Sequence, residues 1–433
     1  MKVMKIIYIS IISIAILLST SNVNAQNESL SLSAAIEKTL ESNYGIVISK
    51  SDVQISEINN SWGAAGRYPT IEFTATPSYR NDLIGENVTT TVSGNLSLNW
   101  TLLNGFRVHI TKEKFEKLEN LAKGRAGVVI ENTIQDVILG YYNILLQKER
   151  LGVLSKLMKL SKDRFDYEQT KFEIGGSVTY NVLLVKNIYL EDKASFLNQE
   201  VVVKNAVRNL NFLLGEQARQ EWDFTEEFKS DTVDFILADL MDKMMVSNQT
   251  LQNQYINLLL QQEEIKLQKS TLYPRLSLNA GISNAYMWND SEIPTNTNPV
   301  ESLVPNGSVT LSYDIYSAGS RRRAIHIAQI NEEISTIETE EIKHSLTNQL
   351  YNEFETYNLR KELVNVANES LEAAEMNLQI AKEKFDSGAI NSFNYRDIQL
   401  NYLNSALNQL QSIYNLIYSN SSLTRLTGGF LNE

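Results

Sequence analysis

Apolar and polar residues alternate along four segments of the chain. Every second residue there is apolar and the residues between are mostly polar, which is typical of a β-strand with one nonpolar face. The apolar positions are Ile71, Phe73, Ala75 and Tyr79, then Leu96, Leu98, Trp100 and Leu102, then Leu276, Leu278, Ala280 and Ile282, and finally Val309, Leu311, Tyr313 and Ile315. The pattern predicts two pairs of strands, over residues 70–103 and 275–316.

The segments around the strands have the helical period instead. Their apolar residues step by three and four positions, as in a seam along which long helices pack. All six prolines lie in or beside the strand regions, and proline is excluded from helix interiors. Two such seams are Ile130, Ile134, Val137, Ile138, Tyr141 and Leu145, and Leu403, Leu407, Leu410, Tyr414 and Ile417. We expect helices over residues 31–63, 106–172, 177–214, 232–270, 320–385 and 391–427.

The chain is an internal duplication. The stretch KFEIGGSVTYN at Lys171 matches KFDSGAINSFN at Lys384, and NLNFLLG at Asn209 matches SLTRLTG at Ser422, with the same separation in both cases. Chance rarely keeps one register over such a span. We expect a first repeat over residues 26–215, a linker over 216–231 and a second repeat over 232–433, each repeat with a helix, two strands, a long helix and a shorter helix.

The N-terminus has the layout of a secretory signal. Lys2 and Lys5 precede an apolar core from Ile6 to Leu18, and a polar segment ends at Ala25. We expect residues 1–25 to be a signal peptide. A permanent membrane helix is the weaker interpretation, because a span needs about 20 apolar residues. No later segment is apolar for long enough, so an exported chain of this kind would enter a membrane by its strands.

Each alternating segment, taken alone, also fits a strand of a soluble sandwich. The context favours membrane strands, because the strand pairs are flanked by very long helices in an exported chain and Tyr and Trp mark the strand ends. Four strands cannot close a barrel, and unpaired strand edges cannot face lipid. The chain must therefore oligomerise, and two, three or four copies would each give an even number of strands.

Composition excludes several classes of function. A net charge of -12 without a long basic run argues against nucleic acid as a partner. The absence of cysteine excludes disulfides and thiolate sites. The sequence has no phosphate-binding loop, no dinucleotide fingerprint and no nucleophile elbow. We expect no enzyme activity and no cofactor, so that any energy comes from a partner protein.

Two further patterns carry little weight. Glu341 and His344 have the spacing of a di-iron helical pair, but such a site needs two pairs and two more glutamates. We keep a helical-bundle metalloenzyme as a remote alternative and expect no metal site. Arg321–Arg323 opens a helix, where cations oppose the helix dipole. A solvated charge run explains this stretch, as would contact with lipid head groups or a neighbouring chain.

Several motifs recur in an ordered, duplicated set. They are the early LSLSAAIEKTLESN stretch, Tyr-Pro before each strand pair, the junctions that end at Gly105 and Gly319, and the turns at Gly175 and Gly388. This set resembles the TolC family of outer-membrane efflux proteins. The resemblance implies a mainly α fold with a small membrane β-barrel portion. Three chains would each give four strands to one twelve-stranded barrel, and the long helices would form a trimeric tunnel through the periplasm.

The resemblance also implies a function. The chain would be a passive exit duct for small molecules or polypeptides in the outer membrane of a Gram-negative bacterium. Its partners would be an inner-membrane pump and a periplasmic adaptor, with the adaptor meeting the turns at Gly175 and Gly388. Gly105 and Gly319 would mark the change from barrel to tunnel. The alternative is an exported coiled-coil scaffold or adhesin without channel activity.

In the family, the inner end of the tunnel is closed through a Tyr, an Arg and two acidic residues around the second turn. Carried over position by position from Gly388, the Tyr and Arg positions fall on Phe385 and Ile390, and the first acidic position on Asn394. The family's linking bonds therefore cannot form here in the same way.

The second acidic position is Asp397, and Tyr395 and Arg396 are nearby candidates to replace the missing groups. Three copies of Asp397 around an axis would form a narrow acidic ring that favours cations. The alternative is that Asp397 and Arg396 are ordinary solvated residues of the first helical turn.

Overall fold

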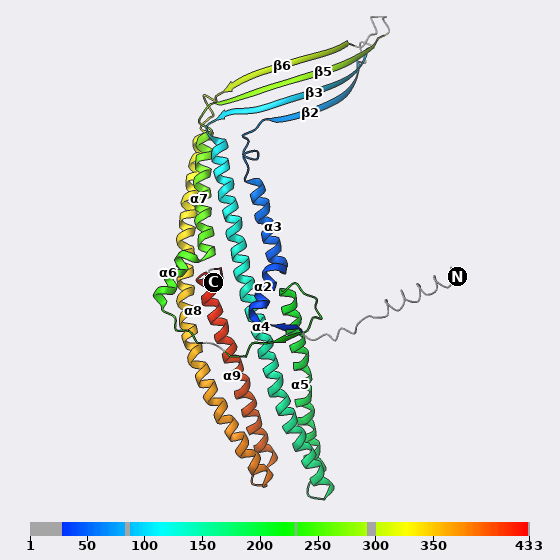
Figure 1. The fold of residues 1–433 in the computed structure, drawn as a ribbon, viewed down its shortest axis with the longest axis vertical. Helices are drawn as coiled ribbons and strands as arrows, with labels where there is room; N and C mark the ends of the chain where they lie inside the picture. Colours follow the sequence, from blue (N-terminus) through cyan, green and yellow to red (C-terminus); the bar gives the residue numbers. More distant parts are fainter. Residues whose placement is uncertain (1–27, 83–86, 230–231, 292–299, 432–433) are drawn as a thin grey trace, which may run out of the picture. The chain divides into compact units, whose positions relative to one another are not determined.

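The computed structural model describes residues 28–82, 87–229, 232–291 and 300–431. The expected signal peptide, residues 1–25, lies outside them. Within the described residues the chain is mainly helical, with a four-stranded sheet and a two-stranded sheet (Figure 1). The prediction of a mainly α fold with a small β portion is confirmed.

The two halves of the chain repeat one order of elements. The first half contains β1 (Glu28–Leu30), α2 (Leu32–Ser42), α3 (Tyr44–Asn59), β2 (Thr70–Asp82), β3 (Asn87–Asn104), α4 (Arg107–Glu173), α5 (Thr179–Leu213) and β4 (Trp222–Phe224). The second contains α6 (Leu237–Ser247), α7 (Gln249–Ser270), β5 (Arg275–Ser291), β6 (Val300–Ser312), α8 (Ser320–Asp386), α9 (Ser392–Leu426) and the 3-10 turn η1 (Gly429–Leu431). Helices α4 and α8 have 67 residues each, and α5 and α9 have 35 each, as a duplication requires.

The chain forms two compact units, each built from three stretches. The first unit comprises residues up to Asn43, Asp136–Asp231 and Arg360–Tyr418. The second comprises Tyr44–Gln135, Thr232–Leu359 and the residues from Ser419 onward. Among the described residues, no helix combines the length and the apolar composition needed to cross a bilayer.

The core of the first unit surrounds Tyr141. Its ring is fully buried and meets Phe224 edge to face, with 5.2 Å between ring centroids. Its hydroxyl donates a 2.7 Å hydrogen bond to the carbonyl of Leu30. Leu30 and Phe224 belong to β1 and β4, which pair in parallel and were missed by the sequence analysis. Strands of three residues are too short to show an alternating pattern.

Two expected helices are each broken at an asparagine. The prediction of single helices over residues 31–63 and 232–270 is wrong, because Asn43 and Asn248 are extended, with ψ of 127° and 115°. The side-chain amide of Asn43 donates to the carbonyl of Leu213 at 2.8 Å, and that of Asn248 to Leu426 at 2.9 Å. Asn43, between α2 and α3, thus binds the end of α5, and Asn248, between α6 and α7, binds the end of α9.

The predicted apolar seam of α9 is confirmed in part, since Leu410 and Ile417 are buried. Leu403 and Leu407 are only half-buried, whereas Tyr402 and Ala406, one position earlier, are buried. The predicted seam of α4 is largely confirmed by Ile134, Val137, Tyr141 and Leu145, all of which are buried.

The four-stranded sheet belongs to the second unit and has the order β2-β3-β5-β6, antiparallel throughout. The hairpins of the two repeats therefore pair side by side through β3 and β5. Among the residues that the structure describes, β2 and β6 each have a strand neighbour on one side only.

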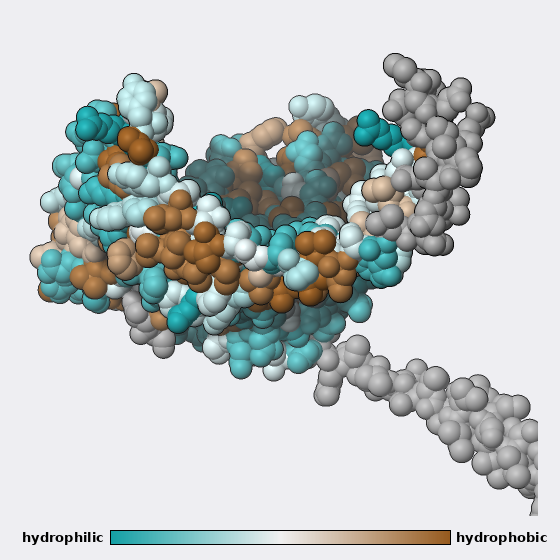
Figure 2. All heavy atoms as spheres, turned by 90° about the horizontal axis from the view of Figure 1, so that it is seen from above, coloured by the Kyte–Doolittle hydropathy of each residue, from teal (hydrophilic) through white to brown (hydrophobic). Residues whose placement is uncertain are grey.

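The register of the sheet places the apolar residues of all four strands on one face. Residues paired across strands share a face. Two paired rows are Ile71, Leu98, Ala280 and Gly307, and Phe73, Leu96, Ile282 and Pro305. This face is not covered within the chain, since Phe73 is 70% exposed and Leu311 67%. Figure 2 shows hydrophobic residues, in brown, along the outer side of a curved band.

Two details of the strand prediction are wrong. A β-bulge between Thr101 and Leu103 puts Leu103, rather than Leu102, opposite Leu276 on the apolar face. Strand β6 ends at Ser312, so Tyr313 and Ile315 lie beyond it, although both continue the alternation.

Candidate functional site

Gly175 and Gly388 lie in matching turns of the first unit, between α4 and α5 and between α8 and α9. Both have left-handed backbone, with φ of +78° and +75°. The N–H of Gly176 donates to the backbone carbonyl of Lys171 at 2.8 Å, and the N–H of Ala389 donates to the backbone carbonyl of Lys384 at 2.7 Å. This is the hydrogen bond of a Schellman motif at the end of a helix. No atom lies within 4 Å of a Cβ built at Gly175 or Gly388. Both turns are exposed, as a contact surface requires.

Near the second turn, Arg396 of α9 forms an ion pair with Asp192 of α5. Two guanidinium nitrogens donate to the two carboxylate oxygens at 2.8 Å each. Only 14% of the Arg396 side chain and 7% of the Asp192 side chain are exposed. A bidentate pair that is shielded from water fixes the two helices relative to each other. The candidate residue Arg396 is therefore not a solvated residue of the first helical turn.

A second arginine, Arg164 of α4, is buried beside this pair. It is 2% exposed and donates to the carbonyl of Ser392 at 3.2 Å. Burial, and then the positive charge of Arg396, lower the pKa of Arg164 to about 10. Two of its nitrogens, Nε and Nη2, have no hydrogen-bond partner among the described residues. Glu168, also buried, accepts a hydrogen bond from Ser177.

Aromatic side chains pack together around Phe385. Phe385 stacks on Tyr395 with 4.9 Å between ring centroids and meets Tyr167 edge to face at 5.7 Å. Tyr395 is 4% exposed, and burial raises the pKa of its hydroxyl. Ile390 packs against the same cluster. Phe385 and Ile390 thus make apolar contacts with this cluster.

The two remaining candidate residues of the inner end are exposed. The backbone N–H of Asn394 donates a 2.9 Å hydrogen bond to the side-chain oxygen of Asn391, which caps the start of α9. Asp397 follows one position after Arg396, and its side chain makes no hydrogen bond or ion pair with any described residue. The structure therefore separates Asp397 from the buried Arg396–Asp192 pair.

Sequence reasoning missed Asp192, Arg164 and Glu168. The sequence holds a signal for Asp192, because it continues the apolar positions Val182 and Val185 at helical spacing. It holds none for Arg164 and Glu168, because the positions before them on the same face, Leu157 and Ser161, do not form an apolar stripe. Their burial is visible only in the fold.

Gly105 and Gly319 lie at the strand-to-helix junctions of the second unit. Each belongs to a pair of left-handed residues, Gly105 with Phe106 (φ of +64° for both) and Gly319 with Ala318 (φ of +73° and +48°). A Cβ at Gly105 would lie 2.4 Å from the carbonyl oxygen of Ser270. Glycine is therefore needed at Gly105 both for its φ and for the close approach of α7.

A metalloenzyme would need several metal-binding side chains held close together. Among the described residues, no group of three or more His, Cys, Asp and Glu side chains is placed to hold a metal ion, including the surroundings of Glu341 and His344.

Comparison with known proteins supports a channel fold. The sequence profile of the family described as outer membrane efflux protein matches residues 240–429. A comparison with curated protein sequences finds no match. Several solved structures have a similar fold, although their sequence identity to this chain is low. The Campylobacter jejuni CmeC outer membrane channel is 13% identical with a TM-score of 0.76, covering 92% of this chain and 85% of that one.

Two further structures have the same fold. CusC, described in the context of transmembrane channel formation, is 15% identical with a TM-score of 0.73, and 95% of each chain is covered. The outer membrane protein VceC from Vibrio cholerae is 10% identical with a TM-score of 0.71, covering 92% of this chain and 96% of that one. The resemblance drawn from the sequence is confirmed by the family match and by these folds.

Proposed function

Since the second half of this chain belongs to the outer membrane efflux protein family and its fold is that of outer-membrane channels, we propose that the protein is a passive exit duct in the outer membrane. It carries small molecules or polypeptides out of the periplasm of a Gram-negative bacterium. The energy for transport comes from an inner-membrane pump, since the sequence has no nucleotide-binding motif.

The exposed apolar face of the sheet is the observation that carries this proposal. A soluble protein rarely leaves a contiguous apolar face of this kind uncovered. Acyl chains of the membrane would cover it, and the polar residues of the other face, such as Glu72, Asn95 and Asn279, would line a water-filled lumen.

The open edges of the sheet support closure by other copies of the chain. Because β2 and β6 run in opposite directions, the β6 edge of one copy can pair antiparallel with the β2 edge of the next. Every backbone group at the edges then finds a partner, as a membrane requires. Three copies give the twelve-stranded barrel that the family resemblance implies.

The exposed turns at Gly175 and Gly388 are the surface that meets the periplasmic adaptor. They are matched in sequence and in hydrogen bonding, so one adaptor surface can contact both in the same manner. Gly105 and Gly319 are the points where barrel strands become tunnel helices.

The inner end of the duct is held by the pair of Arg396 and Asp192, which ties α9 to α5. Asp397 and Asn394, both exposed on the first turns of α9, line the constriction. Opening then requires the Arg396–Asp192 pair to separate, because the bidentate bond fixes the spacing of the two helices.

Single-channel recording tests the duct directly. The full chain, purified in detergent, should have the mass of a trimer and should give stable conductance steps in planar bilayers. Replacing Asp397 with Ala should weaken block by divalent cations. An exported scaffold or adhesin would give no conductance at any protein concentration.

A further inference from the structure

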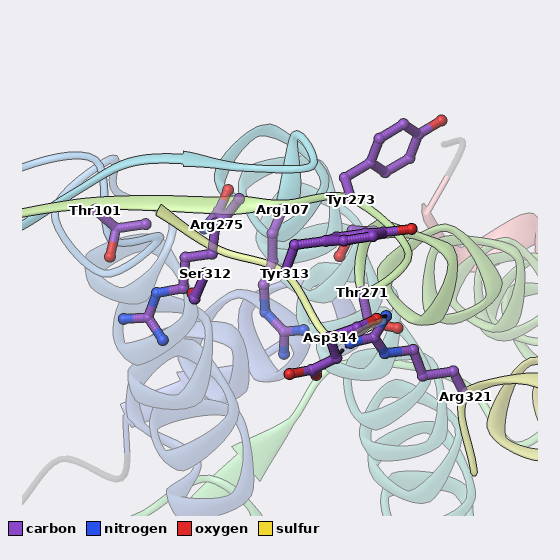
Figure 3. A pocket seen from close by; sticks show the side chains of 11 residues that line it. Thr101, Arg107, Thr271, Tyr273, Arg275, Ser312, Tyr313, Asp314 and Arg321 are labelled. Atoms are coloured by element: carbon purple, nitrogen blue, oxygen red, sulfur yellow. Dashed lines mark hydrogen bonds and ion pairs between the residues drawn. The ribbon is translucent and has the colours of Figure 1, made fainter. Parts of the chain in front are cut away.

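Arg164 of α4 is a buried cation that forms no ion pair with any residue that the structure describes. It is 2% exposed, and its Nη1 donates a 3.2 Å hydrogen bond to the backbone carbonyl of Ser392. Its Nε and Nη2 have no hydrogen-bond partner among these residues. Arg107 and Arg275 differ from it, because they are exposed around a polar cavity at the strand-to-helix junctions, where water can solvate them (Figure 3). Burial makes an unpaired donor unfavourable, so Arg164 would gain from any arrangement that brings it a carboxylate.

Glu168 is the carboxylate best placed to meet Arg164. The two residues are four positions apart on α4, the spacing at which side chains of a helix form ion pairs. Glu168 is also buried, at 7% exposure. Burial and then Arg396 lower the pKa of Arg164, whereas the charges of Asp192 and Glu168 act in the opposite sense. Asp192 is already held by Arg396 through both of its oxygens, which leaves Glu168.

Glu168 is bound to the first turn instead. Its Oε1 accepts a hydrogen bond from the hydroxyl of Ser177, two residues after Gly175 in the loop between α4 and α5. At the other end, Ser392 is the first residue of α9. Glu168 and Ser392 line one cavity of about 560 Å³. The contacts Ser177–Glu168 and Arg164–Ser392 would therefore connect the first turn with the start of α9 if Glu168 and Arg164 could also pair.

Glu168 and Arg164 can pair only if the guanidinium moves. While Nη1 of Arg164 is bound to Ser392, its Nε and Nη2 reach no oxygen of Glu168. If Ser177 moves away with the turn, the buried carboxylate loses its donor, and the free donors of Arg164 can replace it. A charge-assisted hydrogen bond is about twice as strong as a neutral one. Arg164 would then turn from the carbonyl of Ser392 toward Glu168, and one of the contacts that hold the start of α9 would be lost.

We propose that Glu168 switches from Ser177 to Arg164 when a partner protein displaces the turn at Gly175, and that this switch releases the start of α9 from α4. The inference rests on the proposed function, because it explains how docking at the turn acts on the inner end of the duct. The ion pair that joins α9 to α5 remains after the switch. The switch therefore weakens the closure, and the separation of that ion pair completes the opening.

Ser177→Ala tests the switch by removing the donor of Glu168 while both glycines of the turn remain. In planar bilayers, the fraction of time that the full-length channel is open should rise about two- to tenfold, as expected for the loss of one hydrogen bond that holds α9. Gln169→Ala is the matched control. The side chain of Gln169 donates to Glu173 at 3.0 Å near the same turn, but this bond is exposed, so its loss should leave the open fraction unchanged.

Glu168→Gln shows whether the effect passes through the carboxylate. Glutamine can still accept a hydrogen bond from Ser177, but it cannot form an ion pair with Arg164. Adding Ser177→Ala to this variant should therefore change the open fraction much less than the same substitution does in the unmodified chain. Equal effects in both backgrounds would assign the change to the turn itself and overturn the switch.

Hydrogen exchange reports the release of α9 without any current. Backbone amides of residues 395–400, in the first turns of α9, should exchange faster in Ser177→Ala than in the unmodified chain, and at the unmodified rate in Gln169→Ala. If the unmodified chain conducts and Ser177→Ala changes neither the current nor the amide exchange, the switch is excluded and the duct stands. If no variant conducts and the amides still exchange faster in Ser177→Ala, the duct is excluded and the switch stands.

Discussion

The guanidinium of Arg396 holds the carboxylate of Asp192 through two hydrogen bonds of 2.8 Å, across 204 residues of sequence. The pair joins α9 to α5 near the turns that we propose as the adaptor surface. Because both side chains are largely shielded from water, either of them is costly when left alone.

Replacing Arg396 with Ala should therefore both destabilise the protein and open its inner end. We expect a loss of about 3 kcal/mol in the free energy of unfolding, since Asp192 keeps its charge without a partner. Single-channel conductance should rise, because α9 is released from α5. Denaturation in detergent and bilayer recording measure the two effects.

Lys162→Ala is the matched control for this substitution. Lys162 pairs with Asp166 on α4, but the two side chains are 51% and 55% exposed. An exposed pair of this kind contributes at most about 0.5 kcal/mol. If both variants lose the same stability and conduct alike, the Arg396–Asp192 pair has no special role.

Gly105 should tolerate substitution much less than Gly175, although both have positive φ. At Gly175 an added methyl group meets no atom, so Gly175→Ala should cost only the backbone strain of about 1 kcal/mol. At Gly105 the methyl group would lie 2.4 Å from the Ser270 carbonyl oxygen, so the start of α4 must also move away from α7. Gly105→Ala should lower the thermal unfolding midpoint further, and equal midpoints would contradict this account of the junction.

Glu131 should make stability depend on pH. The residue is 5% exposed on α4, and burial raises the pKa of its carboxyl to about 7, an effect that Arg425 partly opposes. Between pH 4.5, the ordinary pKa of a glutamate carboxyl, and a pH of about 7, the folded state therefore binds a proton that the unfolded state has lost. Stability falls as the pH rises through this window and is level above it.

Glu131→Gln should remove this pH dependence. Over the whole window the free energy of unfolding changes by at most about 3 kcal/mol through Glu131. Unfolding in urea at pH 5 and pH 8 measures it. Glu149→Gln, an exposed position of the same helix, should leave the slope as it is. An unchanged slope in Glu131→Gln would assign the pH dependence to other groups.

The long elements of this fold are predictable because their sequence signal repeats many times. The seam through Ile134, Val137 and Tyr141 continues along a helix of 67 residues, so single exceptions do not hide its period. The alternation in β2 and β3 is equally regular, and it predicts which residues share the apolar face.

Helix ends and bulges that depend on a single residue cannot be predicted from a repeating pattern. Asn43 and Asn248 end helices because their side chains bond to Leu213 and Leu426, which are distant in sequence. The bulge near Leu102 is visible only once β3 is paired with β5. The candidate site is affected in the same way: Arg396 was identified, but its partner Asp192 lies in the other repeat.

The orientation of the sheet in the membrane is the central claim, and site-directed labelling tests it most directly. The chain has no cysteine. A cysteine introduced at Phe73 in one variant, or at Thr74 in another, is therefore the single site to which a spin label attaches. These neighbours occupy opposite faces of β2. In protein reconstituted into liposomes, a spin label at Phe73 should relax with oxygen dissolved in the lipid, and a label at Thr74 with a water-soluble nickel complex. If the water-soluble complex reaches both positions equally, the apolar face does not lie against lipid.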